Sequence, residues 1–523
     1  MYIGISLKLW YNYKKILNLY LAFAKIAKAK KPLEGLDNFP MAKIDRKVMY
    51  MKILFAASEA SPFIKVGGLG DVMGGLPKEL NKKGVDARVI LPLYSAIKPE
   101  MRKKLKYVTN LYVNNSWRNN YCGIFTAKID NVTYYFIDNE QYFNREKVYG
   151  SYDDGEIFAF FSRAVLDVLP IIDFIPDIIN ANDWHTAMIP VYLNAFYRER
   201  EEYRNIKTVL SIHNIEFQGK FDPYILGQLF GLDVSYKPLM MYDGDVNVLK
   251  AGIESADLVS TVSNNYANEI LNEEHSFGLC HILNARRNKL RGIINGIDTN
   301  VFNPATDKDI KTNYDISRLQ NKRFNKIDLQ NEMALSRQED VPIIAMVSRL
   351  TKQKGLDLFY PVMDEIANLP VQIIILGTGD EEYENMLRGW EYNRHDKIRS
   401  VIKFSSALAS KIYAGADILL MPSKSEPCGL SQLIAMRYGT IPIVHTVGGL
   451  KDTVVPFNPE TKEGVGLTFQ SYDSFDMLDA IKRAVDLYYD KKNWKILRKN
   501  AMSKDVSWNY PAEQYINMYK ELI

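Results

Sequence analysis

The sequence predicts an α/β protein with two doubly wound parallel-sheet domains that face each other across a cleft. Short apolar runs alternate with helical stretches from Met51 onward, which is the pattern of parallel βαβ units. The alternation stops at residues 303–338, which are polar and charged without a strand-like run, and it then resumes. A chain of 523 residues with 47% hydrophobic residues is also long enough for more than one core.

These observations divide the chain into five parts. We expect a poorly ordered N-terminal extension at 1–50, a first domain at 51–302, an interdomain region at 303–340 and a second domain at 341–500. The last segment, 501–523, has Trp508 and Tyr510 near its start, and we expect a helix there that crosses back to the first domain.

The expected strands are short apolar runs, each followed by polar or small residues. In the first domain they cover 51–57, 87–92, 132–137, 177–180, 208–212, 258–262 and 292–294. In the second domain they cover 342–347, 371–376, 401–404, 417–421 and 441–444. Ligands of open parallel sheets bind just beyond the carboxyl ends of the strands, so the residues after these runs are the candidate site.

The first fifty residues differ from the rest in charge. They carry ten Lys and Arg against three Asp and Glu, whereas the remainder carries 56 against 59, so the body is near neutral and a nucleic-acid partner is disfavoured. Residues 16–29 fit a basic amphipathic helix, but no apolar run reaches the roughly 20 residues that span a bilayer. Signal and transit peptides also fit badly. We expect a start codon assigned too far upstream; a weak membrane or partner contact is the alternative.

The three cysteines favour a reducing cytoplasm. Cys122, Cys280 and Cys428 are scattered, form no CxxC pair and are too few for a disulfide framework. His275 and His281 lie close to Cys280 in sequence, but no fourth ligand stands at a familiar spacing, so we expect no metal site.

A glycine-rich turn follows the first expected strand. Gly67, Gly68 and Gly70 allow backbone amides to approach an oxyanion, a helix begins at the same point, and Lys65 adds a full charge. The alternative is a glycine-rich turn that binds nothing. Gly68, Gly70 and Gly74 do not form GxGxxG, which disfavours a dinucleotide site.

In the second domain, cations follow the first strand. Arg349 and Lys354 stand between that strand and a helix, where a guanidinium fork, a compact ammonium and free helix amides suit a diphosphate. Solvated surface charges are the alternative. Gly377 begins a weaker turn of the same kind after the next strand.

One further carboxylate stands out. Glu426 precedes a proline at an expected helix start, and Gly429 exposes backbone amides beside it. A carboxylate facing a cation-rich cleft can accept hydrogen bonds from sugar hydroxyls or shield positive charge at an anomeric carbon. The alternative is a carboxylate that only complements the helix dipole. Gly448 and Gly449 supply another turn at a strand end.

These segments together resemble the bacterial glycogen synthases and plant starch synthases. The resemblance runs in unbroken order from about Met51 to the C-terminus and rests on seven segments: Lys65–Val72, Asn182–His185, His213–Asn214, Asn295–Asp298, Ser348–Gly355, Glu426–Leu430 and Gly448–Thr453. It implies a GT-B fold of two Rossmann-like domains, the first the starch-synthase catalytic domain and the second the donor-binding domain.

The resemblance implies transfer of glucose from ADP-glucose to the non-reducing 4-OH of an α-1,4-glucan, with retention of configuration and release of ADP. It assigns catalytic positions to Asp183, His213, Arg349, Lys354 and Glu426. It assigns donor contacts to Lys65, Gly67, Gly68, Asn295, Gly377, Gly429, Leu430 and Ser431. No cofactor beyond the donor is implied, because fixed cations can stabilise the leaving diphosphate without a metal.

Several alternatives stay open at this point. A same-fold transferase could use UDP-glucose or another acceptor, and a protein that binds glucan without turnover is the competitor from another class; a dinucleotide-dependent oxidoreductase lacks its fingerprint. Both a front-face reaction and a double displacement are compatible with retention, and we favour the front-face route because no second carboxylate pairs with Glu426. Ser425, Phe404 and Gly278–His281 depart from the family pattern, which leaves base preference and acceptor contacts open. The sequence does not set an oligomeric state.

Overall fold

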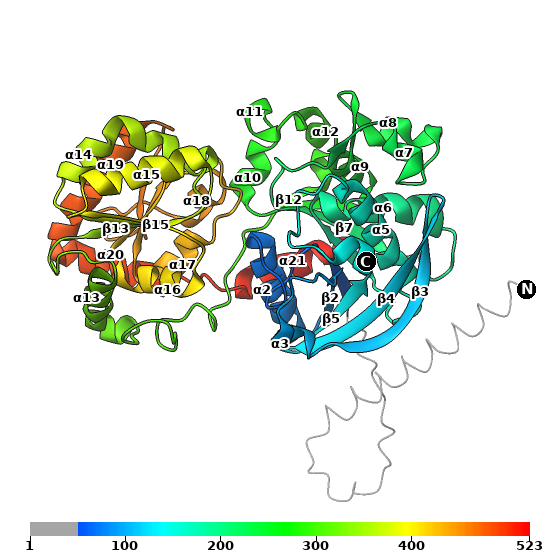
Figure 1. Ribbon diagram of the computed structural model, residues 1–523, viewed down its shortest axis with the longest axis horizontal. Coiled ribbons are helices and arrows are strands. Elements are labelled where there is room, and N and C mark those ends of the chain that lie inside the picture. The colour runs from blue at the N-terminus through cyan, green and yellow to red at the C-terminus, as the bar shows by residue number, and fades with distance from the viewer. Residues whose placement is uncertain (1–50) are drawn as a thin grey trace, which may run out of the picture. The chain divides into compact units, whose positions relative to one another are not determined.

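The first domain of the computed structural model is built on a nine-stranded mixed sheet (Figure 1). The structure describes residues 51–523, and the extension expected at 1–50 lies outside them. The strand order is β12-β11-β7-β6-β1-β2-β5-β4-β3. The strands are β1 (Lys52–Ala56), β2 (Asp86–Pro92), β3 (Lys106–Asn115), β4 (Arg118–Ile129), β5 (Val132–Asp138), β6 (Ile178–Asn182), β7 (Lys207–Ile212), β11 (Leu258–Thr261) and β12 (Leu290–Gly292).

The sheet is parallel from β12 to β5, and its other edge is an antiparallel meander of β5, β4 and β3. The two meander strands β3 and β4 escaped the sequence prediction. β3 is exposed along most of its length and β4 mixes exposed and buried positions, so neither has the continuous apolar run of a strand buried on both faces. A small separate sheet contains β8 (Lys220–Phe221), β9 (Met241–Tyr242) and β10 (Asp245–Asn247).

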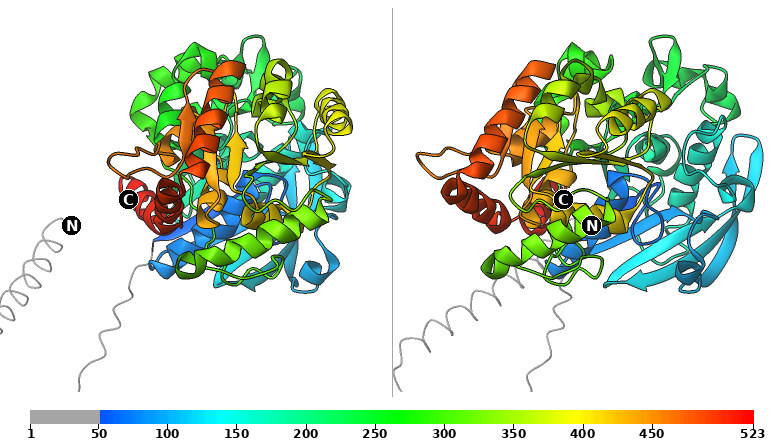
Figure 2. Two further views of the ribbon diagram at one scale, coloured as in Figure 1. Left: turned by 90° about the vertical axis from the view of Figure 1, so that its left-hand side faces the viewer. Right: turned by 60° about the vertical axis from the view of Figure 1, so that its left-hand side comes forward.

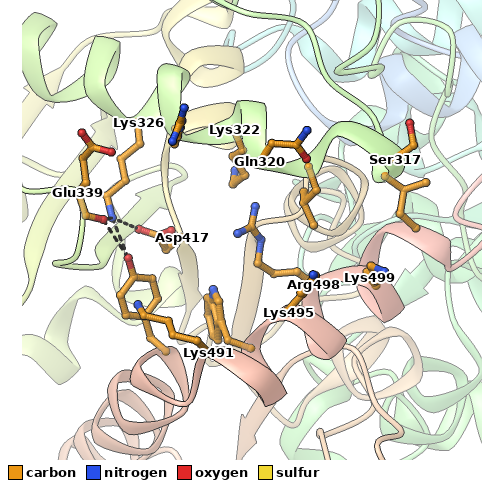
Figure 3. A pocket seen from close by; sticks show the side chains of 16 residues that line it. Ser317, Gln320, Lys322, Lys326, Glu339, Asp417, Lys491, Lys495, Arg498 and Lys499 are labelled. Atoms are coloured by element: carbon orange, nitrogen blue, oxygen red, sulfur yellow. Dashed lines mark hydrogen bonds and ion pairs between the residues drawn. The ribbon is translucent and has the colours of Figure 1, made fainter.

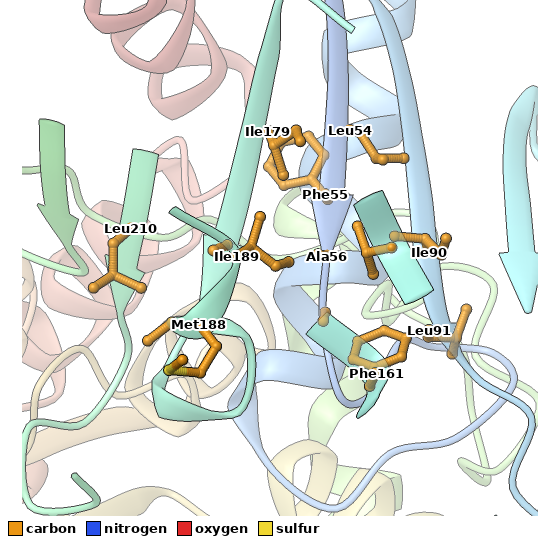
Figure 4. Packing of buried hydrophobic residues seen from close by; sticks show 14 of the residues in the cluster. Leu54, Phe55, Ala56, Ile90, Leu91, Phe161, Ile179, Met188, Ile189 and Leu210 are labelled. Atoms are coloured by element: carbon orange, nitrogen blue, oxygen red, sulfur yellow. The ribbon is translucent and has the colours of Figure 1, made fainter. Parts of the chain in front are cut away.

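The middle of the first sheet is the centre of its core. Figure 4 shows Leu54, Phe55 and Ala56 of β1 beside Ile90 of β2 and Ile179 of β6, all fully or almost fully buried. Helix α5 (Asp154–Asp167) covers this region together with the short α6 (Met188–Tyr192). Burial on both faces fixes β1, and so it fixes where the loop after β1 emerges.

The second domain has a purely parallel six-stranded sheet with helices on both faces (Figure 2). The order is β15-β14-β13-β16-β17-β18. The strands are β13 (Ile343–Val347), β14 (Gln372–Gly377), β15 (Ile398–Ile402), β16 (Ile418–Met421), β17 (Ile441–His445) and β18 (Leu467–Phe469). Its helices include α13 (Lys322–Glu332), α15 (Glu381–Asn393), α16 (Ser406–Gly415), α17 (Ser431–Arg437), α19 (Ser474–Tyr489) and α20 (Lys491–Ser503). β15 begins before the predicted 401–404 because Arg399 and Ser400 interrupt its apolar run. These strands and helices enclose a core of their own, so the predicted two-domain α/β fold is confirmed.

The chain passes between the domains twice, and the two crossings touch each other. The Ile297 amide donates to the Val506 carbonyl at 2.9 Å, and Ile297 forms a parallel bridge with Ser507. Gly296 lies so close to the Ser507 carbonyl that a Cβ would collide with it. The return crossing begins after Ser503, where α20 ends, three residues beyond the expected boundary at 500.

The chain then ends in α21 (Asn509–Lys520), which packs on α2 (Gly68–Lys82) of the first domain (Figure 1). Trp508 is 4% exposed, and its indole covers Gly75, where a Cβ would collide with the ring. Lys83 at the end of α2 pairs with Glu513 at 2.8 Å. The C-terminal helix is therefore a component of the first core.

Candidate active site

Two predicted catalytic residues of the first domain meet at the ends of β6 and β7. Asp183 Oδ1 accepts a hydrogen bond from the His213 backbone amide at 2.7 Å, and His213 Nε2 lies 2.9 Å from Asn182 Oδ1. Asp183 has a φ of 55° and a ψ of −176°, a conformation that costs a non-glycine residue about 1–3 kcal/mol. Such strain persists only where the surrounding contacts hold it, and functional sites are where it collects.

Burial perturbs both of these side chains. It raises the pKa of Asp183 to about 7 against the hydrogen bonds from the His213 and Asn214 amides, which lower it. It lowers the pKa of His213 to about 4. His213 is therefore a neutral imidazole near pH 7, and Asp183 titrates near neutrality.

The glycine-rich loop is organised by a carboxylate that the sequence analysis did not single out. Glu59, which is buried, accepts hydrogen bonds from the Val66 and Gly67 amides. The sequence predicts loop amides that face an oxyanion, but the Val66 and Gly67 amides are already bonded to Glu59 inside the protein. Lys65 pairs with Asp71 at 2.7 Å and keeps a side chain that is 42% exposed, so its ammonium is the charge that the loop presents to solvent. Gly68, in the same glycine-rich segment as Lys65, is exposed as well.

In the second domain, the structure brings Lys354 and Glu426 together. The Lys354 ammonium lies 2.6 Å from Glu426 Oε2, which also accepts the Ser423 hydroxyl at 2.9 Å. The side chains are 18% and 9% exposed, so this is a largely buried ion pair. The two residues come from loops after β13 and β16, neighbouring strands of the sheet.

Arg349 follows β13 in the same loop as Lys354, is exposed, and forms no hydrogen bond or ion pair with Lys354 or Glu426. Its guanidinium donates to Gln353 Oε1 at 3.2 Å, and the Gln353 amide donates to Glu216 Oε2 at 3.2 Å. Glu216 belongs to the first domain, in the loop that carries His213. Gln353 therefore links the predicted diphosphate clamp to the opposite wall of the cleft.

Several glycines at these strand ends have a packing reason that the sequence did not disclose. A Cβ at Gly377 would collide with the Ser348 carbonyl, one at Gly448 with the Glu426 carbonyl, and one at Gly449 with the Cys428 carbonyl. The loops after neighbouring strands stack backbone on backbone. This stacking holds the Glu426 segment in place.

The remaining predicted donor contacts lie where the domains face each other. Gly429 has a φ of 73°, in the left-handed region, and leads through Leu430 into Ser431, the first residue of α17. Burial raises the pKa of Tyr413 to about 12, with a hydrogen bond to Ser431 lowering it and the charge of Asp71 raising it.

Asn295 is 6% exposed and meets the second domain at Cys428. Burial raises the pKa of the Cys428 thiol to about 12, although backbone and side-chain hydrogen bonds from Asn295 lower it. Asn295 Oδ1 is buried and has no hydrogen-bond partner within residues 51–523. A buried acceptor without a partner at a candidate site is available to a ligand.

The domains also cap each other's helices. The Gly448 amide, at the start of α18 (Gly448–Thr453), donates to Glu269 at 2.9 Å, and the Asn265 amide, in α10 (Asn264–Glu269), donates to Asp452 at 2.9 Å. Each carboxylate accepts from the first turn of the opposite helix, which the helix dipole favours. Nothing in the sequence signals pairings across 179 and 187 positions.

Elsewhere, ligand atoms of Glu273, Cys280 and His281 lie within 4.8 Å of one another, with only Cys280 buried. His275, which lies close to Cys280 in sequence, does not belong to this group. The absence of a metal site stays a prediction. Within residues 51–523, helices that are both long and apolar enough to cross a bilayer do not occur.

Comparison with known proteins covers most of the chain. Residues 52–285 match the starch synthase catalytic domain family, and residues 330–502 match the glycosyl transferases group 1 family. A glycogen synthase of Ligilactobacillus salivarius is 49% identical over 90% of this chain and 100% of its own length. One from Clostridium botulinum is 49% identical over 90% of this chain and 99% of its own.

Solved structures agree. The catalytic domain of starch synthase IV from Arabidopsis thaliana, bound to ADP and acarbose, matches with a TM-score of 0.85 and 33% identity over 90% of this chain and 99% of that one. A sucrose-phosphate synthase from Thermosynechococcus elongatus, at 17% identity and a TM-score of 0.57, shares the fold. The chain therefore belongs to the glycogen and starch synthase family of GT-B glycosyltransferases.

Proposed function

We propose that this protein is a glycogen synthase that transfers glucose from ADP-glucose to the non-reducing 4-OH of an α-1,4-glucan, with retention, and releases ADP. The observation that carries the proposal is the buried Lys354–Glu426 pair at the carboxyl ends of β13 and β16, with Arg349 in the same loop as Lys354. Ligands of open parallel sheets bind at this edge. We place the reaction in the cytoplasm, in keeping with the three free cysteines.

In this proposal, Arg349 and Lys354 bind the diphosphate and stabilise the charge that develops on it as the anomeric bond breaks. The Arg349 fork can grip two phosphate oxygens, and the Lys354 ammonium is already desolvated, which strengthens its action on a nearby anion. Glu426 holds Lys354 in position before the donor arrives. The second carboxylate oxygen of Glu426, Oε1, can then accept a hydrogen bond from a sugar hydroxyl.

In the front-face route, every bond that breaks or forms and the transferred proton can be accounted for with these groups. The bond between the anomeric carbon and the diphosphate oxygen breaks, the bond to the acceptor 4-oxygen forms on the same face, and the 4-OH proton moves to the departing diphosphate. Lys354 and Arg349 hold that diphosphate as it departs. A double displacement would instead need a carboxylate on the opposite face, and Asp183 at the end of β6 is the acid to test for that role.

His213 serves as a hydrogen-bond partner of the sugar. As a neutral ring whose Nε2 faces the Asn182 oxygen, it donates through Nε2 and keeps Nδ1 as an acceptor. Lys65, Asn295 and the amides from Gly429 to Ser431 complete the donor site. Gly68 allows the backbone to approach the donor closely, whereas Gly67 and Gly377 hold the loops: the Gly67 amide is bonded to Glu59, and Gly377 lies against the Ser348 carbonyl.

Closure of the two domains excludes water from the reacting glucosyl group, which would otherwise be hydrolysed. The Gln353–Glu216 bond and the reciprocal caps between α10 and α18 are contacts that hold the two walls together.

The test is nucleotide release from the purified protein given glycogen and either ADP-glucose or UDP-glucose, with Arg349→Ala as control. We expect faster ADP release with incorporation of glucose into glycogen, both lost in the control. A preference for UDP-glucose would reassign the donor, and glycogen binding without turnover on either donor would refute the catalytic proposal.

A further inference from the structure

A cavity of about 540 Å³ lies in the second domain, at the opposite edge of its sheet from the candidate active site. It is bordered by η5 (Ile316–Asn321), α13 and α20 (Figure 3). Glu339 and Asp417 line it, and they precede β13 and β16, whereas Arg349 and Glu426 follow those strands. β13 has five residues, which at about 3.3 Å per residue separates the two edges by about 17 Å.

The cavity is strongly cationic. Seven of its lining side chains are basic and two are acidic: Lys322, Arg323, Lys326, Lys491, Lys495, Arg498 and Lys499 against Glu339 and Asp417. The two acids are already paired. Asp417 lies 2.8 Å from Lys326, and Glu339 pairs with Arg337 at 3.1 Å. The lining therefore carries five more basic than acidic side chains.

The basic side chains divide into two groups. Lys322 donates to the Tyr413 and Ala414 carbonyls and to Thr440, and Lys326 is held by Asp417, so both are structural. The side chains of the other five form no hydrogen bond or ion pair with any residue from 51 to 523, although Lys491 lies over the Tyr488 ring at 3.9 Å and Arg323 over the Phe324 ring at 4.8 Å. These five are Arg323, Lys491, Lys495, Arg498 and Lys499.

Two hydrogen-bond donor atoms of the lining are both buried and without an acceptor in residues 51–523. Trp494 is 4% exposed, and its indole Nε1 has no acceptor within the described chain; nor has Arg498 Nε. Figure 3 shows Arg498 projecting from α20 toward the space between α20 and α13. Burial lowers the pKa of Arg498, against the attraction of Asp417. Buried donors of this kind are normally satisfied, so two of them lining one cavity point to an acceptor that binds there.

A water-filled gap edged by solvated lysines is the plain alternative. It accounts for Lys495 and Lys499, which are exposed, but not for Arg498 and Trp494, whose donors turn inward at a cost of about 1–3 kcal/mol each when unsatisfied. The volume also falls within the roughly 300–1,000 Å³ typical of small-molecule sites.

We propose that this cavity is a second binding site, separate from the diphosphate site, for a small metabolite that carries phosphate. Arg498 offers its guanidinium fork to the phosphate oxygens, the Trp494 indole donates one hydrogen bond, and Lys491, Lys495 and Lys499 neutralise the remaining charge.

The site touches the segments that lead into both crossings between the domains. η5 and α13 follow the outgoing crossing at Ile297, and α20 runs directly into the return crossing at residues 504–508. A bound anion bridges these two segments. Because linkage is reciprocal, occupancy that alters domain closure would also be altered by the donor.

The experiment is calorimetric titration of the protein with inorganic pyrophosphate while saturating ADP occupies the diphosphate site. Arg349→Gln provides a second way to remove binding at that site. We expect one saturable pyrophosphate site under both conditions, accompanied by a change in tryptophan fluorescence that is lost in Trp494→Phe.

Arg498→Gln and the exposed double variant Lys495→Gln/Lys499→Gln should each weaken this binding at least tenfold. Lys492→Gln removes the same single charge as Arg498→Gln from the same helix, but outside the cavity, and it should leave the affinity within about twofold. The proposal is overturned if ADP-saturated protein shows no saturable binding, or if all these variants bind pyrophosphate equally. A tryptophan change that persists in Trp494→Phe would equally refute it.

Discussion

Separating the structural from the chemical role of Lys354 and Glu426 is the sharpest test of the candidate site. The pair is 2.6 Å long with side chains 18% and 9% exposed, so the charge left behind by Glu426→Gln stays largely buried. Breaking a buried pair from one side costs about 3–5 kcal/mol. For a domain of this size, about 3 kcal/mol lowers the Tm by roughly 6–12 °C.

The double variant Lys354→Met/Glu426→Gln removes both charges and keeps an acceptor for the Ser423 hydroxyl. Replacing both ions of a buried pair is often neutral for stability. We therefore expect its Tm to return to within about 3 °C of the parent, since about 1 kcal/mol corresponds to 2–4 °C. Activity should not return, because the ammonium that stabilises the leaving diphosphate is gone; groups of this kind contribute about 10²–10³ in kcat.

The assay is calorimetric Tm together with initial rates of ADP release at saturating ADP-glucose. Rates that recover with Tm in the double variant would show that the pair only holds the loops of β13 and β16 together. An unchanged Tm in Glu426→Gln would contradict the burial argument itself. Lys424→Gln is the control, because Lys424 is an exposed charge two residues away from Glu426.

The other predictions concern single positions. Arg349→Gln, at an exposed side chain, should lower kcat/KM at least tenfold and leave Tm within about 2 °C, and a matching loss of Tm would contradict a binding role. Gly75→Ala should cost about 1–3 kcal/mol in urea unfolding because its Cβ meets a buried indole, whereas Gly389→Ala, in open space on a helix, should gain up to about 1 kcal/mol. The pKa of Asp183 is about 7 in the folded protein against an ordinary 3.8, so its contribution to folding stability falls as pH rises from about 4 to 7. The pKa of His213 is about 4 against an ordinary 6.5, so its contribution to folding stability rises over the same pH range. Asp183→Asn should therefore gain more Tm between pH 4 and 7 than the parent does. If Tm changes with pH equally in the two proteins, the pKa of Asp183 is not raised.

The sequence predicts the buried parallel strands well because burial on both faces demands an unbroken apolar run. β1, β7, β11, β13, β14, β16 and β17 all begin and end within a few residues of the runs that predicted them. The prediction fails where a strand has only one buried face or is very short. β3 and β4 alternate or face solvent, and β18 is three residues long. A weak or brief apolar pattern carries too little information there.

The candidate site shows a different limit. Single residues that bear a charge at a strand end, such as Lys354 and Glu426, were identifiable because strand ends are where ligands bind. Their partners were not. Glu59 organises the glycine-rich loop, and Glu269 caps a helix of the other domain, yet each is an ordinary acidic residue in sequence. Only the fold determines which amides a carboxylate faces.

The glycines at the strand ends show the same difference between what the sequence predicts and what only the fold determines. In the sequence, Gly377, Gly448 and Gly449 indicate turns that let a backbone approach a ligand. In the structure, what each approaches is the carbonyl of a neighbouring loop: Ser348, Glu426 and Cys428. Two of these three carbonyls belong to the segment that carries Glu426, the proposed catalytic carboxylate. A side chain at Gly448 would therefore displace Glu426 without touching any substrate, and its effect on kcat would be mistaken for the loss of a ligand contact. The glycine pattern at the strand ends thus specifies how the site is held in place, and the charged residues specify what it binds.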